Sequence, residues 1–271
     1  MSVRLEGVAL VYPNGYRAFG GIDFSIAPGE RVAIIGPSGA GKSTLLRLMA
    51  AALRPSGGTV EVLGAAPWRL DRGALRRLRS RIGMVHQAPP IPPRQRAVTA
   101  VLAGRLGRWS MWKGLASLAY PADRAGARAV LERMEIADKL YERCDRLSGG
   151  QLQRVGVARV LYQEPDLLLA DEPVSAVDPA LSERIISELD REATTRRVTL
   201  VASLHAVDLA LRWFPRIIGL RSGEIAFDLP AGQVSEDMLR ELYVSEQTLP
   251  VQDSRLSAVN MAAIKRQRTC S

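Results

Sequence analysis

Gly36-Pro37-Ser38-Gly39-Ala40-Gly41-Lys42-Ser43-Thr44 is the stretch that decides the fold of this chain. Residues 31–35 before it, which are apolar after Arg31, predict a strand, and residues 45–50 after it predict a helix. A strand, a turn with the spacing G-x-x-x-x-G-K-S and a helix start form a phosphate-binding loop, in which backbone N–H groups converge on a phosphate. Lys42 would reach the β- and γ-phosphates of a nucleotide, and the Ser43 hydroxyl would bind Mg²⁺. The alternative is an ordinary glycine-rich turn with a surface lysine.

The composition is typical of a globular protein without membrane spans. The 271 residues are 47% hydrophobic and 24% charged, which allows one large domain or two small ones with a sizeable core. No apolar run approaches the roughly 18 residues of a membrane span, and the N-terminus lacks the apolar core of a signal peptide. Cys144 and Cys270 lie far apart without metal-like spacing, so we interpret both as free thiols without an assigned role. These features predict a cytoplasmic protein.

The chain is strongly basic, with a formal net charge of +9. Basic residues occur along the whole chain, with one local run at 70–81. Nucleic acid, an anionic membrane surface, a bound nucleotide or a solvated arginine-rich surface would each account for this charge. Residues 109–118 mix tryptophan, basic and apolar residues, which suits either a membrane-facing surface or packing between helices.

Two acids follow a predicted buried strand. Residues 167–170 are all apolar, which suits a parallel strand covered on both faces, and Asp171 and Glu172 come directly after them. Ligands of open α/β sheets bind at the carboxyl ends of the strands. Because adjacent side chains on a strand point in opposite directions, the two acids need different tasks. Asp171 suits the Mg²⁺ shell, and Glu172 can accept a proton from water.

Three further features are candidates for the same site. Tyr12 ends the strand predicted for residues 3–11, where it either stacks on an adenine ring or is a half-buried strand tyrosine. Ser148 opens an S-G-G-Q sequence, which is either a plain helix N-cap or a second anion-binding helix start. His205, one of two histidines, follows the buried strand predicted for residues 198–203.

These motifs, in this order, resemble the ATP-binding subunits of ABC transporters over residues 3–246. The motifs that carry the resemblance are the phosphate loop at 36–44, a glutamine after a strand (Gln87), LSGGQ at 147–151, a Walker B segment with its glutamate at 166–172, an S-x-x-D sequence at 175–178, and His205. The resemblance implies ATP and Mg²⁺ as ligands. The residues that it implies for ATP are Tyr12, Gly36, Pro37, Ser38, Gly39, Ala40, Gly41, Lys42, Ser43, Thr44, Gln87, Ser148, Gly149, Gly150, Gln151, Asp178 and His205. The residues that it implies for Mg²⁺ are Ser43, Gln87 and Asp171.

The resemblance also implies a catalytic set of Lys42, Gln87, Glu172 and His205. Glu172 would orient or deprotonate the attacking water, and His205 would contact the γ-phosphate. In the expected head-to-tail homodimer, the phosphate loop of one chain and residues 148–150 of the other hold each ATP, and Asp178 links the two sites. Permease subunits would be direct partners and a solute-binding protein an indirect one. The expected location is the cytoplasmic face of the cell membrane.

The fold expected from the resemblance is α/β: a P-loop NTPase (RecA-like) core with a mixed sheet, an inserted ABC helical subdomain and an N-terminal antiparallel β region. Residues 1–246 would form one ATPase domain. Within it, 1–87 and 163–246 would be the catalytic core and 88–162 the helical subdomain with the LSGGQ motif. Residues 247–271 are predicted to be a disordered tail.

A narrower resemblance is to the ATPases of phosphonate importers. The segments that carry it are residues 11–15, 101–108, 203–211, 227–230 and 239–243. The chain departs from the usual pattern after Gln87, where four prolines occur within residues 89–93. This departure does not affect the motifs for ATP hydrolysis. It concerns which permease the chain engages, and therefore whether the solute is phosphonate. The alternatives are an ABC ATPase for phosphate or another solute, in import or export, and a soluble ABC ATPase acting on nucleic acid or ribosomes. The single cassette without a long coiled coil disfavours the last, so no nucleic-acid partner is expected.

Overall fold

The computed structural model describes residues 1–109, 112, 123–175 and 177–244. Its strands form a three-stranded sheet with the order β2-β1-β4 and a six-stranded sheet with the order β5-β6-β7-β3-β8-β9. The strands are β1 (Val3–Val11), β2 (Arg17–Ile26), β3 (Arg31–Ile35), β4 (Gly57–Val62), β5 (Ile82–Val85), β6 (Leu167–Asp171), β7 (Thr199–Ser203), β8 (Arg216–Arg221) and β9 (Glu224–Pro230). The small sheet is antiparallel, whereas the large sheet is parallel except for β9. The predicted mixed sheet and N-terminal antiparallel region are confirmed.

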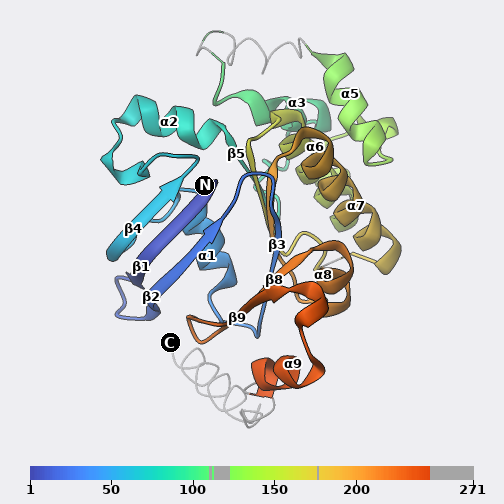
Figure 1. The fold of residues 1–271 in the computed structure, drawn as a ribbon. Coiled ribbons are helices and arrows are strands. Elements are labelled where there is room, and N and C mark those ends of the chain that lie inside the picture. The colour runs from blue at the N-terminus through green and yellow to red at the C-terminus, as the bar shows by residue number, and fades with distance from the viewer. Residues whose placement is uncertain (110–111, 113–122, 176, 245–271) are drawn as a thin grey trace, which may run out of the picture.

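The helices cover the large sheet on both faces (Figure 1). They are α1 (Lys42–Met49), α2 (Arg72–Ser80), α3 (Ala97–Leu102), α5 (Arg124–Arg133), α6 (Gly149–Gln163), α7 (Pro179–Arg196), α8 (Val207–Trp213) and α9 (Glu236–Tyr243). The sequence of residues 97–106 predicts a single helix, but α3 ends at Leu102 and the chain continues as a 3-10 turn over Ala103–Arg105. Of the helices in the described part of the chain, none combines the length and the hydrophobicity that crossing a bilayer requires.

The alternation of side chains along β3 divides the core into two layers. Val32 and Ile34 pack with α1 and the small sheet, whereas Ala33 and Ile35 face a cluster that includes α3, α5, α6, α7 and α8. Both pairs are fully buried, as expected for a parallel strand covered on both sides. Figure 1 shows the small sheet on one side of the large sheet and α6, α7 and α8 on the other. The phosphate loop therefore lies between two packed layers.

The helical segment from 88 to 162 shares its hydrophobic cluster with the large sheet. Val101 of α3, Leu131 of α5 and Val157 of α6 belong to the same buried group as Leu168 of β6. The division of the chain into a core and a helical subdomain stays a prediction. Cys144 is a free, buried thiol, while Cys270 and the predicted tail lie outside the described residues. So does most of the tryptophan-containing segment at 109–118.

Parallel pairing brings the site segments together. β3, β6 and β7 are neighbours in the large sheet, so the phosphate loop after β3, the acids at the end of β6 and the histidine after β7 share one edge. Asp171 is directly opposite Ser203 in the register of β6 and β7. The carboxyl edge of a parallel sheet is where ligands bind in such folds.

Candidate nucleotide-binding and hydrolysis site

Two glycines shape the phosphate loop. Gly36 has a φ of 149°, and a Cβ there would lie 2.0 Å from the carbonyl oxygen of Leu220. Gly41 has a φ of 105° and precedes α1, and a Cβ there would lie 2.8 Å from the ring of Phe19. A side chain fits neither position without displacing its neighbours. Since Gly41 gives α1 no side-chain cap, the first amides of the helix are not satisfied by the residue that precedes them.

Lys42 is held inside the loop. Lys42 is only 4% exposed, and its Nζ donates to the carbonyl oxygens of Gly36 at 2.7 Å and Pro37 at 3.2 Å. The loop thus positions an ammonium group beside the helix start. A buried cation at a helix N-terminus favours a polyanion such as a nucleotide phosphate.

Asp171 is the point where three segments meet. The hydroxyls of Ser43 and Ser203 both donate to its Oδ1, at 2.8 Å and 2.9 Å respectively. Asp171 is itself buried. A hydroxyl and a carboxylate at one point are the hard oxygen donors that Mg²⁺ takes from a protein when phosphates complete its shell, so the residues fit this ion. Sequence reasoning missed Ser203, whose role depends on the pairing of β6 with β7.

Glu172 and His205 form a close pair. His205 Nε2 lies 2.6 Å from Glu172 Oε1, and the glutamate side chain is 12% exposed against 44% for the histidine. The Glu172 N–H donates to the hydroxyl of Ser203 at 3.0 Å. Glu172 also has a φ of 47°, an uncommon value for a residue other than glycine. Such backbone strain concentrates at functional sites, and here it accompanies a carboxylate held in one orientation.

Two tyrosines lie near the phosphate loop. The Tyr12 hydroxyl lies 3.0 Å from Thr44 Oγ1, which ties the ring to the first turn of α1. Tyr16 stacks against Tyr12, with ring centroids 6.2 Å apart and an interplanar angle of 28°. The sequence does not single out Tyr16, because this residue reaches the phosphate loop only through the hairpin between β1 and β2, which is a feature of the tertiary structure.

These groups surround one cleft of about 530 Å³. Its lining consists of Tyr12, Tyr16, Ala18, Ser38, Gly39, Ala40, Gly41, Lys42, Ser43, Thr44, Gln87, Glu172 and His205. Gly36 and Pro37 are not in this lining but hold Lys42, and Asp171 reaches it through Ser43. Over the described ranges, no cluster of three or more His, Cys, Asp or Glu side chains forms a metal cage.

The LSGGQ residues and Asp178 lie away from this cleft in the described chain. Ser148 and Gln151 form a capping box at the start of α6, with Ser148 N–H donating to Gln151 Oε1 at 2.9 Å. Asp178 caps α7 and accepts from the Leu181 N–H at 2.9 Å. None of Ser148, Gly149, Gly150, Gln151 or Asp178 is among the described residues that line the cleft. A single chain therefore places the phosphate-loop residues of the predicted ATP-binding set at the cleft, but not its LSGGQ residues or Asp178.

The family model described as ABC transporter matches residues 19–175. A protein of Cupriavidus necator named "Phosphonates import ATP-binding protein PhnC 1" is 62% identical over 97% of this chain and 94% of its own length. A protein of the same name from Pseudomonas aeruginosa is 59% identical over the full length of both chains.

Solved structures agree with these relatives. The ATP-binding cassette MJ0796, in a dimeric post-hydrolysis state bound to ADP and Pi, is 30% identical with a TM-score of 0.74, covering 84% of this chain and 98% of its own. The protein cbiO1 of Clostridium perfringens, part of the ABC transporter complex cbiONQ, is 25% identical with a TM-score of 0.72, covering 90% and 94%. The expected ABC fold is thereby confirmed. The chain belongs to the family of ABC transporter ATP-binding proteins.

Proposed function

We propose that this chain is the ATPase subunit of an importer that carries phosphonates into the cell. The observation that carries the proposal is the identity of about 60% to phosphonate import ATP-binding proteins over nearly the whole of both chains. The cleft supports the ATPase part, because it combines a phosphate loop, a buried lysine and an oriented carboxylate.

The proposed chemistry assigns each group one task. Lys42 exchanges the carbonyl oxygens of Gly36 and Pro37 for the β- and γ-phosphates of ATP, and the amides of residues 39–44 complete the cradle. Glu172 accepts a proton from the water that attacks the γ-phosphate. His205, 2.6 Å from Glu172, keeps that carboxylate in position and contacts the γ-phosphate. The Tyr12 ring stacks on the adenine.

Mg²⁺ fits the point where Ser43 and Asp171 meet, with Gln87 at the edge of the same cleft. When bound there, the ion would neutralise charge that develops on the phosphate oxygens. The hydroxyl of Ser203 donates to Asp171 Oδ1 and so helps to orient this carboxylate toward the same point.

A second copy of the chain would complete the site. Ser148, Gly149 and Gly150 form a helix start whose amides can receive a phosphate, yet they do not line the cleft of their own chain. A head-to-tail dimer would place this helix start over the γ-phosphate bound by the partner, and Asp178 would connect the two sites. The solved cassette with ADP and Pi is dimeric, which supports this arrangement.

Closure and opening of the dimer would move permease subunits at the cytoplasmic face of the membrane. The segment from Gln87 through the four prolines to α3 connects the cleft to the surface, so it is the proposed route of coupling. A solute-binding protein would take part only through the permease. An ABC ATPase for phosphate or for another solute is the remaining alternative.

The test is the ATPase activity of the chain purified with its membrane partner in proteoliposomes, with the solute-binding protein supplied. We expect alkylphosphonates to raise ATP hydrolysis severalfold, while phosphate and sulfate leave it at the basal rate. Stimulation by phosphate alone would assign the transporter to phosphate. Basal activity that responds to none of these anions would remove phosphonate as the substrate and leave the ATPase assignment standing.

A further inference from the structure

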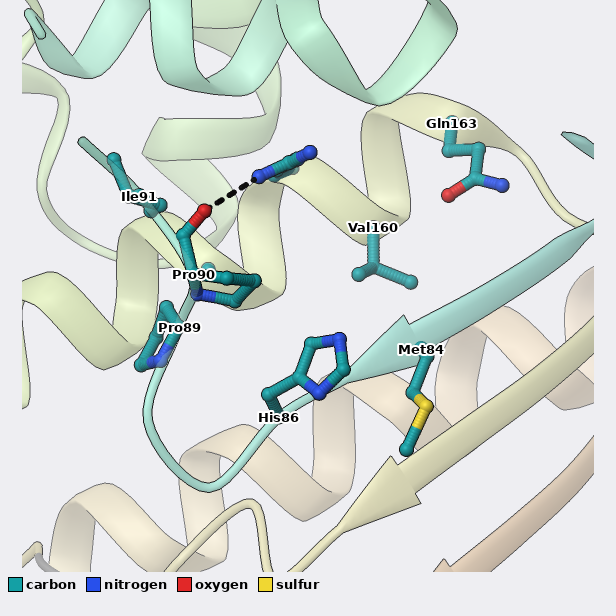
Figure 2. A pocket seen from close by; sticks show the side chains of 9 residues that line it. Met84, His86, Pro89, Pro90, Ile91, Val160 and Gln163 are labelled. Atoms are coloured by element: carbon teal, nitrogen blue, oxygen red, sulfur yellow. Dashed lines mark hydrogen bonds between the residues drawn. The ribbon is translucent and has the colours of Figure 1, made fainter. Parts of the chain in front are cut away.

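Two segments distant in sequence reach the surroundings of the phosphate loop. The first is the proline segment after Gln87, which Figure 2 shows beside α6 and which is the proposed route of coupling. The second is α9, the last helix among the described residues, which contacts Gly36. Figure 1 shows α9 at the end of the molecule where β3 leads into α1. The contact of α9 has no part in the chemistry described above.

The contact is a hydrogen bond to the first residue of the phosphate loop. The Gly36 N–H donates to the hydroxyl oxygen of Tyr243 at 3.2 Å. The two residues lie 207 positions apart in the chain, so only the tertiary fold brings them together. Residues 239–243 carry part of the narrower resemblance, and this bond is a physical task for the last of them.

Three groups fix Gly36 in its place. Tyr243 takes its N–H, Lys42 Nζ donates to its carbonyl oxygen at 2.7 Å, and the Leu220 carbonyl lies so close that it leaves no room for a Cβ. The proposed binding of ATP draws Lys42 away from this carbonyl. Tyr243 is not among the residues that line the cleft, so ATP does not compete for its hydroxyl. The bond from Gly36 to Tyr243 can therefore hold the loop both before and after ATP binds.

The position of Tyr243 depends on how α9 packs against the sheet. A helix of eight residues is too short to be stable alone, so its tertiary contacts decide where it lies. Leu242 is 1% exposed, and Tyr243 packs against the hydrophobic cluster of the large sheet. Arg221 Nη1 at the end of β8 donates to the Glu241 carbonyl at 2.8 Å. Because Leu220 precedes Arg221, the strand end that abuts the phosphate loop also holds α9.

We propose that Tyr243 is a positioning residue for ATP binding: its hydroxyl holds the Gly36 N–H and keeps the phosphate loop in its binding conformation before ATP arrives. The inference rests on the proposed role of this loop in holding the phosphates. A loop that is already in its binding conformation has less freedom to lose when the ligand binds. Tyr243 acts on ATP only through the loop, because it lies outside the cleft lining.

The first test is Tyr243→Phe in the full chain, which keeps the packed ring and removes the hydroxyl. Without the hydrogen bond, a smaller fraction of the free protein has the loop ready for ATP, and the apparent affinity falls by that fraction. We expect the KM for ATP to rise about 2- to 10-fold, the range for one neutral hydrogen bond. The kcat at saturating ATP should stay at the wild-type value, because Glu172 and His205 are unchanged. A merely structural loss would instead lower kcat through the folded fraction and leave KM alone.

The second test needs no nucleotide. Hydrogen exchange of the Gly36 amide, followed by nuclear magnetic resonance, reports how often its hydrogen bond opens. In Tyr243→Phe this amide should exchange about 2- to 10-fold faster than in the wild type, since it loses its acceptor. Tyr141→Phe is the matched control, because Tyr141 is 52% exposed and lies outside the cleft lining. The control should change neither the exchange rate of Gly36 nor the KM for ATP.

The proposal requires both changes in Tyr243→Phe. An unchanged KM would overturn it and leave Tyr243 with a packing role only, whether or not exchange at Gly36 is faster. A raised KM without faster exchange would also overturn it, because the effect would not pass through Gly36. Lys42→Ala separates this inference from the function on which it rests. Weakened ATP binding by Lys42→Ala with an unchanged Tyr243→Phe would overturn the role of Tyr243 alone, whereas normal binding by Lys42→Ala would count against the proposed phosphate loop itself.

Discussion

Glu172→Gln should abolish ATP turnover, with a loss on the order of 10²- to 10⁴-fold, the range that a positioned general base contributes. The physical reason is that an amide cannot accept the proton of the attacking water, although it keeps the shape and burial of the glutamate. Phosphate release under saturating ATP measures this directly. Glu224→Gln, an exposed acid at the start of β9, is the matched control and should hydrolyse ATP at the wild-type rate.

The same variant should keep its affinity for ATP, because the groups proposed to hold the phosphates are unchanged. Trapped in the ATP-bound state, Glu172→Gln should then elute as a dimer when ATP and Mg²⁺ are present and as a monomer without them. Elution as a monomer under all conditions would count against the two-chain site, even if turnover is lost. Turnover near the wild-type rate would remove Glu172 from the chemistry.

Lys42→Ala should weaken ATP binding about 10- to 100-fold, the range expected when a charge-assisted hydrogen bond is lost from a buried site. Without nucleotide, Lys42 Nζ donates to the carbonyls of Gly36 and Pro37. When ATP binds, the phosphates are proposed to replace these carbonyls, so that the full positive charge of Nζ lies beside them. Titration with a fluorescent ATP analogue measures the affinity. Lys139→Ala, which removes a half-buried lysine that pairs with Asp138 and does not line the cleft, is the control.

A thermal unfolding curve must accompany this titration, because the substitution also leaves two loop carbonyls without their ammonium donor. A variant that unfolds like the wild type and binds ATP with unchanged affinity would contradict the role given to Lys42. A variant that is folded and weakened as expected, with Lys139→Ala unaffected, would establish that the loss comes from the phosphate loop.

Elements with strong local signals were predicted closely. β5 (Ile82–Val85) and α8 (Val207–Trp213) begin and end where the apolar pattern and the flanking residues place them. The alternating pattern of residues 22–26 predicts only the second half of β2, which begins at Arg17, because pairing with β1 across an irregular register supports Gly20 and Gly21 in a strand that their propensity disfavours. Long-range pairing of this kind leaves no local trace in the sequence.

The site was predictable where its residues are adjacent in the chain. Asp171 and Glu172 follow directly from a buried strand, and the phosphate loop is contiguous. Ser203 was beyond reach, since its contact with Asp171 comes from the register between β6 and β7. The placement of Tyr16 in the cleft depends on the hairpin between β1 and β2 in the same way.

The most direct measurement of the central claim is uptake of a labelled alkylphosphonate by cells that lack the gene for this chain. The cells are complemented with the wild type, with Glu172→Gln or with Glu224→Gln. We expect uptake with the wild type and with Glu224→Gln and none with Glu172→Gln. This result would show that phosphonate uptake depends on ATP hydrolysis at this cleft. Uptake that persists in the uncomplemented cells, or that Glu172→Gln restores, would contradict the account.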